Sequence, residues 1–406
     1  MFITVKIDSF ISDNVNAALK NNPPGEWMPK LPEECIRLSS GYPDPSLVPS
    51  HQIKDAVSKL IEEEQDLPLH YLGSPRIDVL KKQIQKRLAE RGIKVQEEEL
   101  LITSGACQAL DLIARVLVDE KSVVAVEAPT YMEALEIFQN YTTEIINIPI
   151  DENGLQTIVL EEVLKDRKQK KLPLPRILYT IPTAQNPTGT TMGLERRNHL
   201  LELAEEYDFL ILEDDAYGEL TFGESPPPLK SMDTEGRVVH VGSLSKVVAP
   251  GMRVGWIAGK QAFIAAFAWF KKDLDHPFAQ ASMASFLEDV DFEGRLKRLK
   301  EVYMEKSVIL IKSLESYFPA CVTWYMPSGG YFVWVHIPGI DTSDLLELSL
   351  DKGVSFIPGK YFFLNSQDGT EFLRLSFCYE GESGIIEGVQ RLGQLISDYL
   401  NPSLLK

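Results

Sequence analysis

The sequence has few of the features that mark metal, membrane or nucleic-acid binding. Its four cysteines are far apart and show none of the paired spacings of zinc sites or disulfide frameworks. The longest apolar run, Phe263 to Phe270, is far too short to cross a bilayer. A net charge of −18 argues against a nucleic-acid groove, which needs a basic stripe. We therefore expect no metal site and neither membrane nor nucleic acid as a partner.

The start of the chain lacks the layout of a signal peptide, because acids interrupt its apolar residues. Together with the unpaired cysteines, this favours a cytoplasmic protein. Hydrophobic residues make up 44% and charged residues 25%, the balance of an ordinary globular enzyme. A chain of 406 residues is too long for one core, so we expect a large domain and a smaller one.

Short β-rich runs alternate with amphipathic stretches between residues 60 and 259. This alternation predicts an α/β fold in which a large domain holds a mainly parallel, seven-stranded sheet with helices on both faces. Helical patterns between the strands include Gln108–Leu117, Tyr131–Phe138 and Leu194–Glu206. The predicted strands are Glu99–Thr103, Ser122–Val126, Glu144–Ile150, Arg176–Ile181, Phe209–Leu212, Val238–Val241 and Val254–Ala258.

The last hundred residues have a different texture and predict a smaller α+β domain. A charged helical stretch over Gly294–Tyr317 leads into them. The expected domains are an N-terminal arm with part of the small domain (1–50), a large domain (51–300) and a C-terminal small domain (301–406). The expected strands there are Gly329–His336, Val354–Pro358 and Phe372–Cys378, and the expected helices are Ser343–Asp351 and Glu382–Leu400.

A lysine-containing segment, Ser243-Leu-Ser-Lys246, follows a predicted strand, and Arg253 comes after a Pro-Gly turn. Hydroxyls and a planar guanidinium are donors that suit a phosphate, and a lysine amine can condense with an aldehyde. The segment resembles the S-x-S-K…G-x-R motif of class I aminotransferases, which are fold type I enzymes dependent on pyridoxal 5'-phosphate. The resemblance implies that Lys246 forms a Schiff base with this cofactor and moves the substrate proton. It also implies that Ser243 and Arg253 bind the cofactor phosphate.

Three consecutive acids end another predicted strand, in the order Glu213-Asp214-Asp215-Ala-Tyr217. The carboxyl end of a parallel strand is the usual place for ligand contact. Their spacing alone leaves open which acid faces the ligand. In the family, the acid three residues before the tyrosine pairs with the pyridine nitrogen of the cofactor. The resemblance therefore assigns the catalytic carboxylate to Asp214 and a contact with the phenolic oxygen to Tyr217.

Two loops before these acids also resemble family motifs. Asn186 lies in Asn-Pro-Thr-Gly, and the resemblance implies contacts with the phenolic oxygen and with substrate. Gly105, Ala106 and Cys107 join a strand to a helix, where free backbone N–H groups favour a phosphate. This turn resembles the phosphate-binding turn of the family, although Cys107 stands where a polar side chain is common. Tyr131, in Pro-Thr-Tyr, is either a core residue or, as the resemblance implies, a catalytic-site ring that stacks on the cofactor.

Three further residues complete the resemblance. Tyr71 matches a tyrosine that reaches the phosphate of the neighbouring subunit, which implies a homodimer with shared active sites. Gly41 matches a loop that packs beside substrate. Arg374, in an otherwise apolar strand, matches the arginine that grips the substrate α-carboxylate, and such an arginine is costly to bury unless it is paired.

The resemblance runs from about residue 41 to the C-terminus and is nearest to the aminoadipate and aromatic aminotransferase branch. Departures at Asp275-His-Pro-Phe278 and at Lys360 fall where the family shapes its substrate pocket. The resemblance implies amino transfer between an L-α-amino acid and a 2-oxo acid. One alternative is a cyclase or lyase that eliminates at Cβ or Cγ of a hydroxylated arginine-like amino acid, as in capreomycidine and enduracididine synthases. Another is a non-catalytic, aminotransferase-like sensor.

Overall fold

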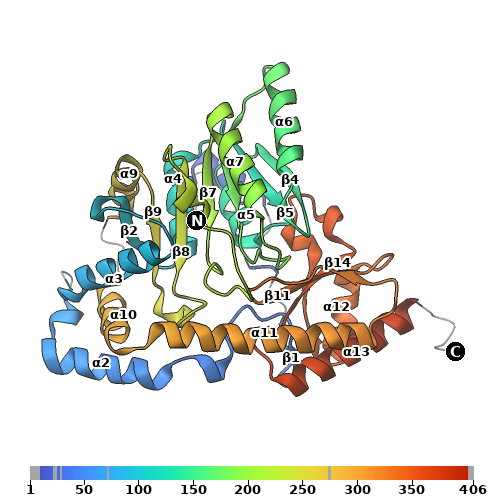
Figure 1. Ribbon diagram of the computed structural model, residues 1–406. Helices are drawn as coiled ribbons and strands as arrows, with labels where there is room; N and C mark the ends of the chain where they lie inside the picture. Colours follow the sequence, from blue (N-terminus) through green and yellow to red (C-terminus); the bar gives the residue numbers. More distant parts are fainter. Residues whose placement is uncertain (1–9, 22–24, 28–29, 71–72, 273–275, 401–406) are drawn as a thin grey trace, which may run out of the picture.

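The computed structural model describes residues 10–21, 25–27, 30–70, 73–272 and 276–400. Its largest sheet has eight strands in the spatial order β2-β9-β8-β7-β6-β3-β4-β5 (Figure 1). The seven predicted strands are confirmed to within two residues at each end. The eight strands are Leu100–Thr103 (β2), Val123–Ala128 (β3), Ile145–Asp151 (β4), Gly154–Leu155 (β5), Pro175–Thr180 (β6), Leu210–Asp214 (β7), Val238–Ser243 (β8) and Gly255–Ala258 (β9).

The sheet is mainly parallel, as predicted. Strands β4, β3, β6, β7 and β8 pair in parallel, whereas β9 is antiparallel to both β8 and β2. The expected number of seven is wrong by one, because β5 adds an antiparallel strand next to β4. With only two residues, β5 is too short to show the alternation from which strands are predicted.

Helices cover both faces of this sheet, whose central strands are buried and apolar on both sides. On one face pack α4 (Ala106–Leu117), α5 (Met132–Gln139) and α9 (Gln261–Lys271). On the other face pack α6 (Thr157–Gln169) and α7 (Leu194–Tyr207). The apolar run that was too short for a membrane span therefore forms α9, which buries Ile264 and Phe267 against the sheet.

A second group of helices lies beside the sheet. Helix α10 packs against both α2 and α3, at the end of the molecule where α11 begins (Figure 1). The short helices α1 and α8 do not belong to this group. The bounds of these helices are Asp13–Ala18 (α1), Ser50–Glu64 (α2), Arg76–Glu90 (α3), Leu229–Met232 (α8) and Pro277–Asp289 (α10).

The C-terminal part has the predicted α+β character. A four-stranded antiparallel sheet has the order β10-β11-β14-β13, and α11 runs from beside α10 to beside α13 (Figure 1). Helix α11 is continuous across the predicted boundary at residue 300. The elements are α11 (Phe292–Tyr317), β10 (Thr323–Trp324), β11 (Phe332–His336), α12 (Thr342–Asp351), β12 (Val354–Ser355), β13 (Ile357–Pro358), β14 (Phe372–Ser376) and α13 (Glu382–Leu400).

The N-terminal segment joins this C-terminal part. Strand β1 (Ile36–Arg37) pairs in parallel with β12. The loop that follows β1 therefore lies between the two parts of the molecule. Its Gly41 carbonyl accepts a hydrogen bond from Lys246, which lies just after β8.

Candidate active site

The turn between β2 and α4 forms one wall of the site. Gly105 has a φ of 87°, and a Cβ at this position would lie 2.6 Å from Nη2 of Arg253. Nη2 of Arg253 in turn donates to the carbonyl of Ser104 at 3.1 Å. Glycine is therefore required both by the backbone and by the guanidinium that packs against it. The structure brings the predicted residues Gly105, Ala106 and Arg253 together.

Ser243, at the end of β8, adds a hydroxyl to this wall. Its Oγ lies 2.8 Å from Oγ of Ser245 and accepts from the backbone N–H of Ser245 at 3.0 Å. The wall thus gathers hydroxyl, guanidinium and helix N-terminal donors. This donor set fits a phosphate group.

Lys246 lies in the turn after β8 and points toward the N-terminal loop. Its Nζ donates to the carbonyl of Gly41 at 3.0 Å and lies 5.7 Å from the ring centre of Tyr217. The hydroxyl of Tyr331 holds the backbone of the lysine by donating to its carbonyl at 2.8 Å. Loss of solvation lowers the pKa of the amine below its usual value. The neutral, nucleophilic form is therefore more accessible than in a surface lysine.

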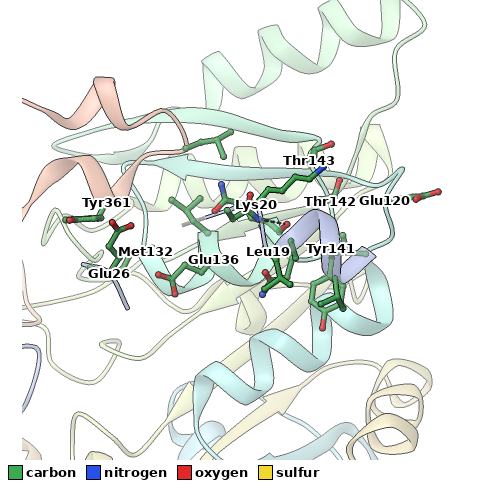
Figure 2. A pocket seen from close by; sticks show the side chains of 18 of the residues that line it. Leu19, Lys20, Glu26, Glu120, Met132, Glu136, Tyr141, Thr142, Thr143 and Tyr361 are labelled. Carbon is green, nitrogen blue, oxygen red and sulfur yellow. Dashed lines mark hydrogen bonds between the residues drawn. The ribbon is translucent and has the colours of Figure 1, made fainter. Parts of the chain in front are cut away.

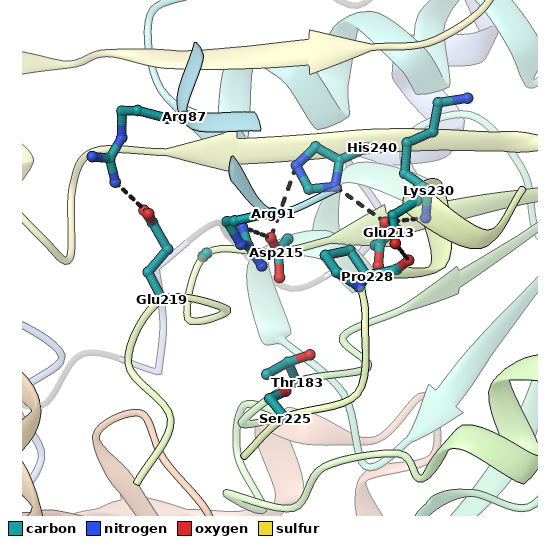
Figure 3. A network of polar contacts seen from close by, with 12 residues as sticks. Arg87, Arg91, Thr183, Glu213, Asp215, Glu219, Ser225, Pro228, Lys230 and His240 are labelled. Atoms are coloured by element: carbon teal, nitrogen blue, oxygen red, sulfur yellow. Dashed lines mark hydrogen bonds and ion pairs between the residues drawn. The ribbon is translucent and has the colours of Figure 1, made fainter. Parts of the chain in front are cut away.

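Asp214, the last residue of β7, is buried at the centre of the site. Its Oδ2 accepts from the hydroxyl of Tyr179 at 2.8 Å, and its Oδ1 accepts from the N–H of Ala216 at 3.3 Å. Burial raises the pKa of the carboxyl to about 6, although the bond from Tyr179 opposes that rise. The neighbouring acids Glu213 and Asp215 bind other groups (Figure 3). Because side chains alternate along a strand, Glu213 points to the face opposite to Asp214.

Arg374 and Asn186 meet where β14 faces the loop after β6. Nη1 of Arg374 donates to Oδ1 of Asn186 at 2.9 Å, and Nη2 donates to the carbonyl of Ser39 at 3.1 Å. Its guanidinium carbon lies 3.9 Å from the ring centre of Phe332. The buried Nε has no hydrogen-bond partner among the described residues, and burial lowers the pKa of the guanidinium to about 10. A buried cation with an unpartnered donor fits a carboxylate ligand.

Tyr131 immediately precedes α5, and two side chains lie near its hydroxyl. Sγ of Cys107 lies 3.8 Å from that hydroxyl and donates to Oε2 of Glu133 at 2.9 Å. Burial, reinforced by the charge of Glu133, raises the pKa of the Cys107 thiol to about 12. The thiol is therefore a neutral hydrogen-bond donor and not a nucleophile.

Several of these partners were missed in the sequence. Tyr179 lies in a predicted strand where an aromatic residue indicates core, and only the pairing of β6 with β7 places it beside Asp214. Glu133 carries a weak signal, since it stands two residues after Tyr131 at the start of a helix. Tyr71 and Asp275 lie outside the described residues.

A cavity of about 1450 Å³ lies beside α5, under the N-terminal segment (Figure 2). Its lining includes Trp27, Met132, Glu136, Lys360 and Tyr361. None of the predicted cofactor-binding residues that the structure describes lines it. The cavity is thus separate from the site around Lys246, and Lys360 lines the cavity.

The site thus combines a lysine amine, a buried carboxylate, a wall of donors that fits a phosphate, and a buried arginine with an unpartnered donor. Residues 33–392 match the family model described as aminotransferase class I and II. The chain belongs to this family. The aminotransferase is therefore a pyridoxal-phosphate-dependent transaminase, as the motifs predicted, and its residues fit that cofactor.

Comparisons with individual proteins agree with the family. Aromatic-amino-acid aminotransferase 1 of Thermococcus litoralis is 38% identical over 90% of this chain and 88% of the relative. A multiple substrate aminotransferase from Thermococcus profundus superposes with a TM-score of 0.89 at 35% identity, covering 98% of this chain and all of that one. An α-aminoadipate aminotransferase from Thermus thermophilus, complexed with N-(5'-phosphopyridoxyl)-L-leucine, gives 0.87 at 31% identity, covering 98% and 100%. These neighbours confirm the fold type I architecture.

The described part of the aminotransferase lacks two other kinds of feature. No helix there is long and apolar enough to span a membrane. No group of histidine, cysteine or acidic side chains there is arranged to hold a metal ion.

Proposed function

We propose that Lys246 holds the cofactor and carries the proton during amino transfer between an L-α-amino acid and a 2-oxo acid. When bound, pyridoxal phosphate supplies an aldehyde and a ring that accepts electrons from the substrate Cα. The lowered pKa of Lys246 supports this role, because a neutral amine can both attack an aldehyde and accept a proton. The carbonyl of Gly41 orients the amine by accepting a hydrogen bond from it.

Asp214 would hold a proton on the pyridine nitrogen. Its carboxyl, with a pKa of about 6, is ionised at neutral pH and can form a charge-assisted bond with that nitrogen. Tyr179 fixes the orientation of the carboxyl by donating to Oδ2. Asn186 and Tyr217, both buried, would contact the phenolic oxygen.

The remaining cofactor contacts follow from the wall beside α4. Ser243, Arg253 and the N–H groups of residues 105–107 would bind the phosphate. Tyr131 would stack on the ring, and the Cys107–Glu133 pair next to its hydroxyl would limit rotation of the tyrosine side chain.

Arg374 would bind the substrate α-carboxylate, and its geometry is the observation that carries the proposal. The guanidinium is buried beside Asn186, has an unpartnered Nε, and forms no ion pair with any described carboxylate. A bidentate carboxylate would satisfy that donor and neutralise the charge. Lys246 would lie nearby, because its amine donates to Gly41, two residues after the Ser39 carbonyl that Arg374 binds.

For the side chain of the substrate we propose aromatic or long apolar amino acids. Phe332 lies 3.9 Å and Phe362 lies 5.2 Å from the guanidinium carbon of Arg374. Trp334 packs edge-on against Phe362, so the wall beside the guanidinium is aromatic. The similar Thermococcus litoralis protein is an aromatic-amino-acid aminotransferase, which points the same way.

We also propose a cytoplasmic homodimer in which Tyr71 of each subunit reaches the partner's cofactor phosphate. The motif around Tyr71 supports the shared site, and the four free cysteines support a reducing compartment. Within each subunit, residues 51–300 would form the cofactor domain, and residues 1–50 and 301–406 would form the arm and small domain.

The test is to mix holoenzyme with a panel of single amino acids and record absorption spectra. Amino donors convert the bound cofactor to pyridoxamine phosphate, and mass spectrometry identifies the product. We expect phenylalanine, tyrosine and leucine to yield 2-oxo acids. Cyclised or eliminated products without pyridoxamine phosphate would contradict amino transfer.

A further inference from the structure

A buried polar network surrounds Glu213 and Asp215 at the end of β7 (Figure 3). Glu213 and Asp215 point into it from β7 and the turn that follows, and His240 points into it from β8. Arg91, just after α3, forms an ion pair with Asp215, and the Asp215 side chain is almost fully buried. None of these side chains has a part in the proposed reaction, and burying so many ionisable groups is costly.

His240 occupies the centre of the network. Its side chain is fully buried, and Nδ1 lies 3.1 Å from Oε2 of Glu213. Nε2 lies 3.9 Å from Oδ2 of Asp215 and has no hydrogen-bond partner among the described residues. An imidazolium donates from both ring nitrogens, so it suits two flanking carboxylates better than a neutral ring, which presents one acceptor.

The sheet connects this network to the candidate active site. Glu213 pairs across the sheet with His240, and the next pair is Asp214 with Val241. Asp214 thus lies between two acids along the chain, with His240 facing both of those acids. The negative charge of Asp215 raises the pKa of the Asp214 carboxyl, and the charge of His240 lowers it.

We propose that His240 is a positioning residue for amino transfer: it acts through Glu213 and Asp215 to keep the carboxyl of Asp214 ionised. This inference rests on the proposed role of Asp214. A positive ring between the two acids offsets the field that they exert on their neighbour. It also fixes the end of β7, and hence the direction in which the Asp214 carboxyl points.

Other charged and polar groups also act on Glu213 and Asp215. Arg91 and Arg197 add positive charge near Glu213 and Asp215. Glu213 also accepts from the backbone N–H groups of Leu229 and Lys230, at 2.7 and 3.0 Å. The Lys230 amine forms an ion pair with Asp233, so it does not offset the charge of Glu213 in place of His240.

The groups that face Asp214 from the opposite side are neutral or weakly acidic. Tyr179 donates to it, and burial raises the pKa of the Tyr179 hydroxyl well above its usual value. The pKa of the Cys107 thiol is about 12, and burial raises the pKa of Glu127 to about 7. Tyr217 likewise has a pKa raised by burial. None of these groups supplies a positive charge, which leaves the cations of the network as the offset.

The test loads the full-length enzyme with pyridoxamine phosphate and measures its dissociation constant by equilibrium dialysis between pH 5 and 8. Pyridoxamine phosphate has no aldehyde, so Lys246 cannot retain it covalently. In the wild type we expect affinity to fall as the pH drops below about 6. The midpoint is the pH at which half of this fall in affinity has occurred. In His240→Gln we expect the midpoint to rise by about 0.5–1 pH unit. The matched control, His199→Gln, changes a half-buried histidine bound to Thr157 and should keep the wild-type midpoint.

Adding Asp215→Asn to His240→Gln removes an uncompensated charge and should bring the midpoint back toward the wild type. Asp215→Asn alone should lower it, which keeps the inference testable if His240→Gln does not fold. A uniform loss of affinity at every pH, or a midpoint that Asp215→Asn leaves unmoved, would overturn the role of His240. An Asp214→Asn enzyme that retains the wild-type midpoint would instead overturn the proposed function.

Discussion

Arg374 donates to Oδ1 of Asn186 at 2.9 Å and so joins the C-terminal sheet to the loop that follows β6. The two residues are far apart in sequence and come from different parts of the fold. Substrate bound to Arg374 would therefore lie beside the residue proposed to contact the cofactor oxygen. The proposed binding of the substrate and the proposed placement of the cofactor would be coupled through this bond.

Arg374→Lys should raise KM for amino acids by about 5- to 150-fold, since charged hydrogen bonds contribute roughly 1–3 kcal/mol. The lysine keeps a positive charge but loses the planar fork. Steady-state kinetics with phenylalanine measures the change, while the cofactor spectrum should stay as in the wild type. An equal loss with an amine that has no carboxylate would show that Arg374 does not bind that group.

Lys246→Ala should reduce kcat by several orders of magnitude, because it removes the amine that is proposed to attack the aldehyde and return the proton. Borohydride reduction followed by peptide mass spectrometry gives an independent measurement. The wild type should carry the reduced cofactor on the peptide that contains Lys246, and the variant should carry none. A covalently labelled, active Lys246→Ala enzyme would remove the central assignment.

Asp214→Asn should weaken cofactor binding but stabilise the cofactor-free protein at pH 7. Burial raises the pKa of this carboxyl from 3.8 to about 6, so the folded state holds a proton that the unfolded state releases between these values. The stabilising contribution is complete below about pH 4 and is lost as the pH rises through 6. We expect a gain of about 1–3 kcal/mol from urea unfolding at pH 7, shrinking toward pH 4. A less stable variant at pH 7 would contradict the shift.

Cys107 should resist alkylation at pH 8, since its thiol has a pKa of about 12 and only the thiolate reacts. Cys321 is exposed and serves as the internal control. With iodoacetamide, peptide mapping should show Cys107 reacting at least about 10³-fold more slowly than Cys321. Glu133→Gln should reduce the difference between the two alkylation rates, because it removes the negative charge that opposes ionisation of the Cys107 thiol. Equal rates in the wild type would show that the thiol is not held by Glu133.

The shared-site proposal predicts complementation between inactive variants. Tyr71→Phe combined with a second lesion on the partner-facing side, mixed with Lys246→Ala, should regain activity as subunits exchange. One site of each heterodimer carries both lesions and the other carries neither. Cofactor loss and dimer dissociation should also be linked, because a ligand that bridges subunits stabilises the assembled form. A fully active monomer at low concentration would argue against Tyr71 in this role.

Much of the fold follows from the sequence because local patterns determine it. All seven predicted strands formed, and the residues at the ends of β7 and β8 lie where the motifs placed them. The partners of those residues could not be predicted, because they depend on strand pairing over long separations. Tyr179 and His240 each look like core residues in their own strands. Only the order β8-β7-β6 brings one to Asp214 and the other to the acids beside it.

The pairing of β1 with β12 has a consequence for synthesis of the chain on the ribosome. Ile36 pairs with Val354, so more than three hundred residues must be added to the chain before the short parallel strand pair can form. At about 5–20 residues per second, this delay is on the order of 15–60 s. During that interval the strands of the large sheet can emerge and pair, while the loop containing Gly41 lacks the β1–β12 pair that fixes its start. The N-terminal side of the site around Lys246 is therefore completed only after residue 354 has been added.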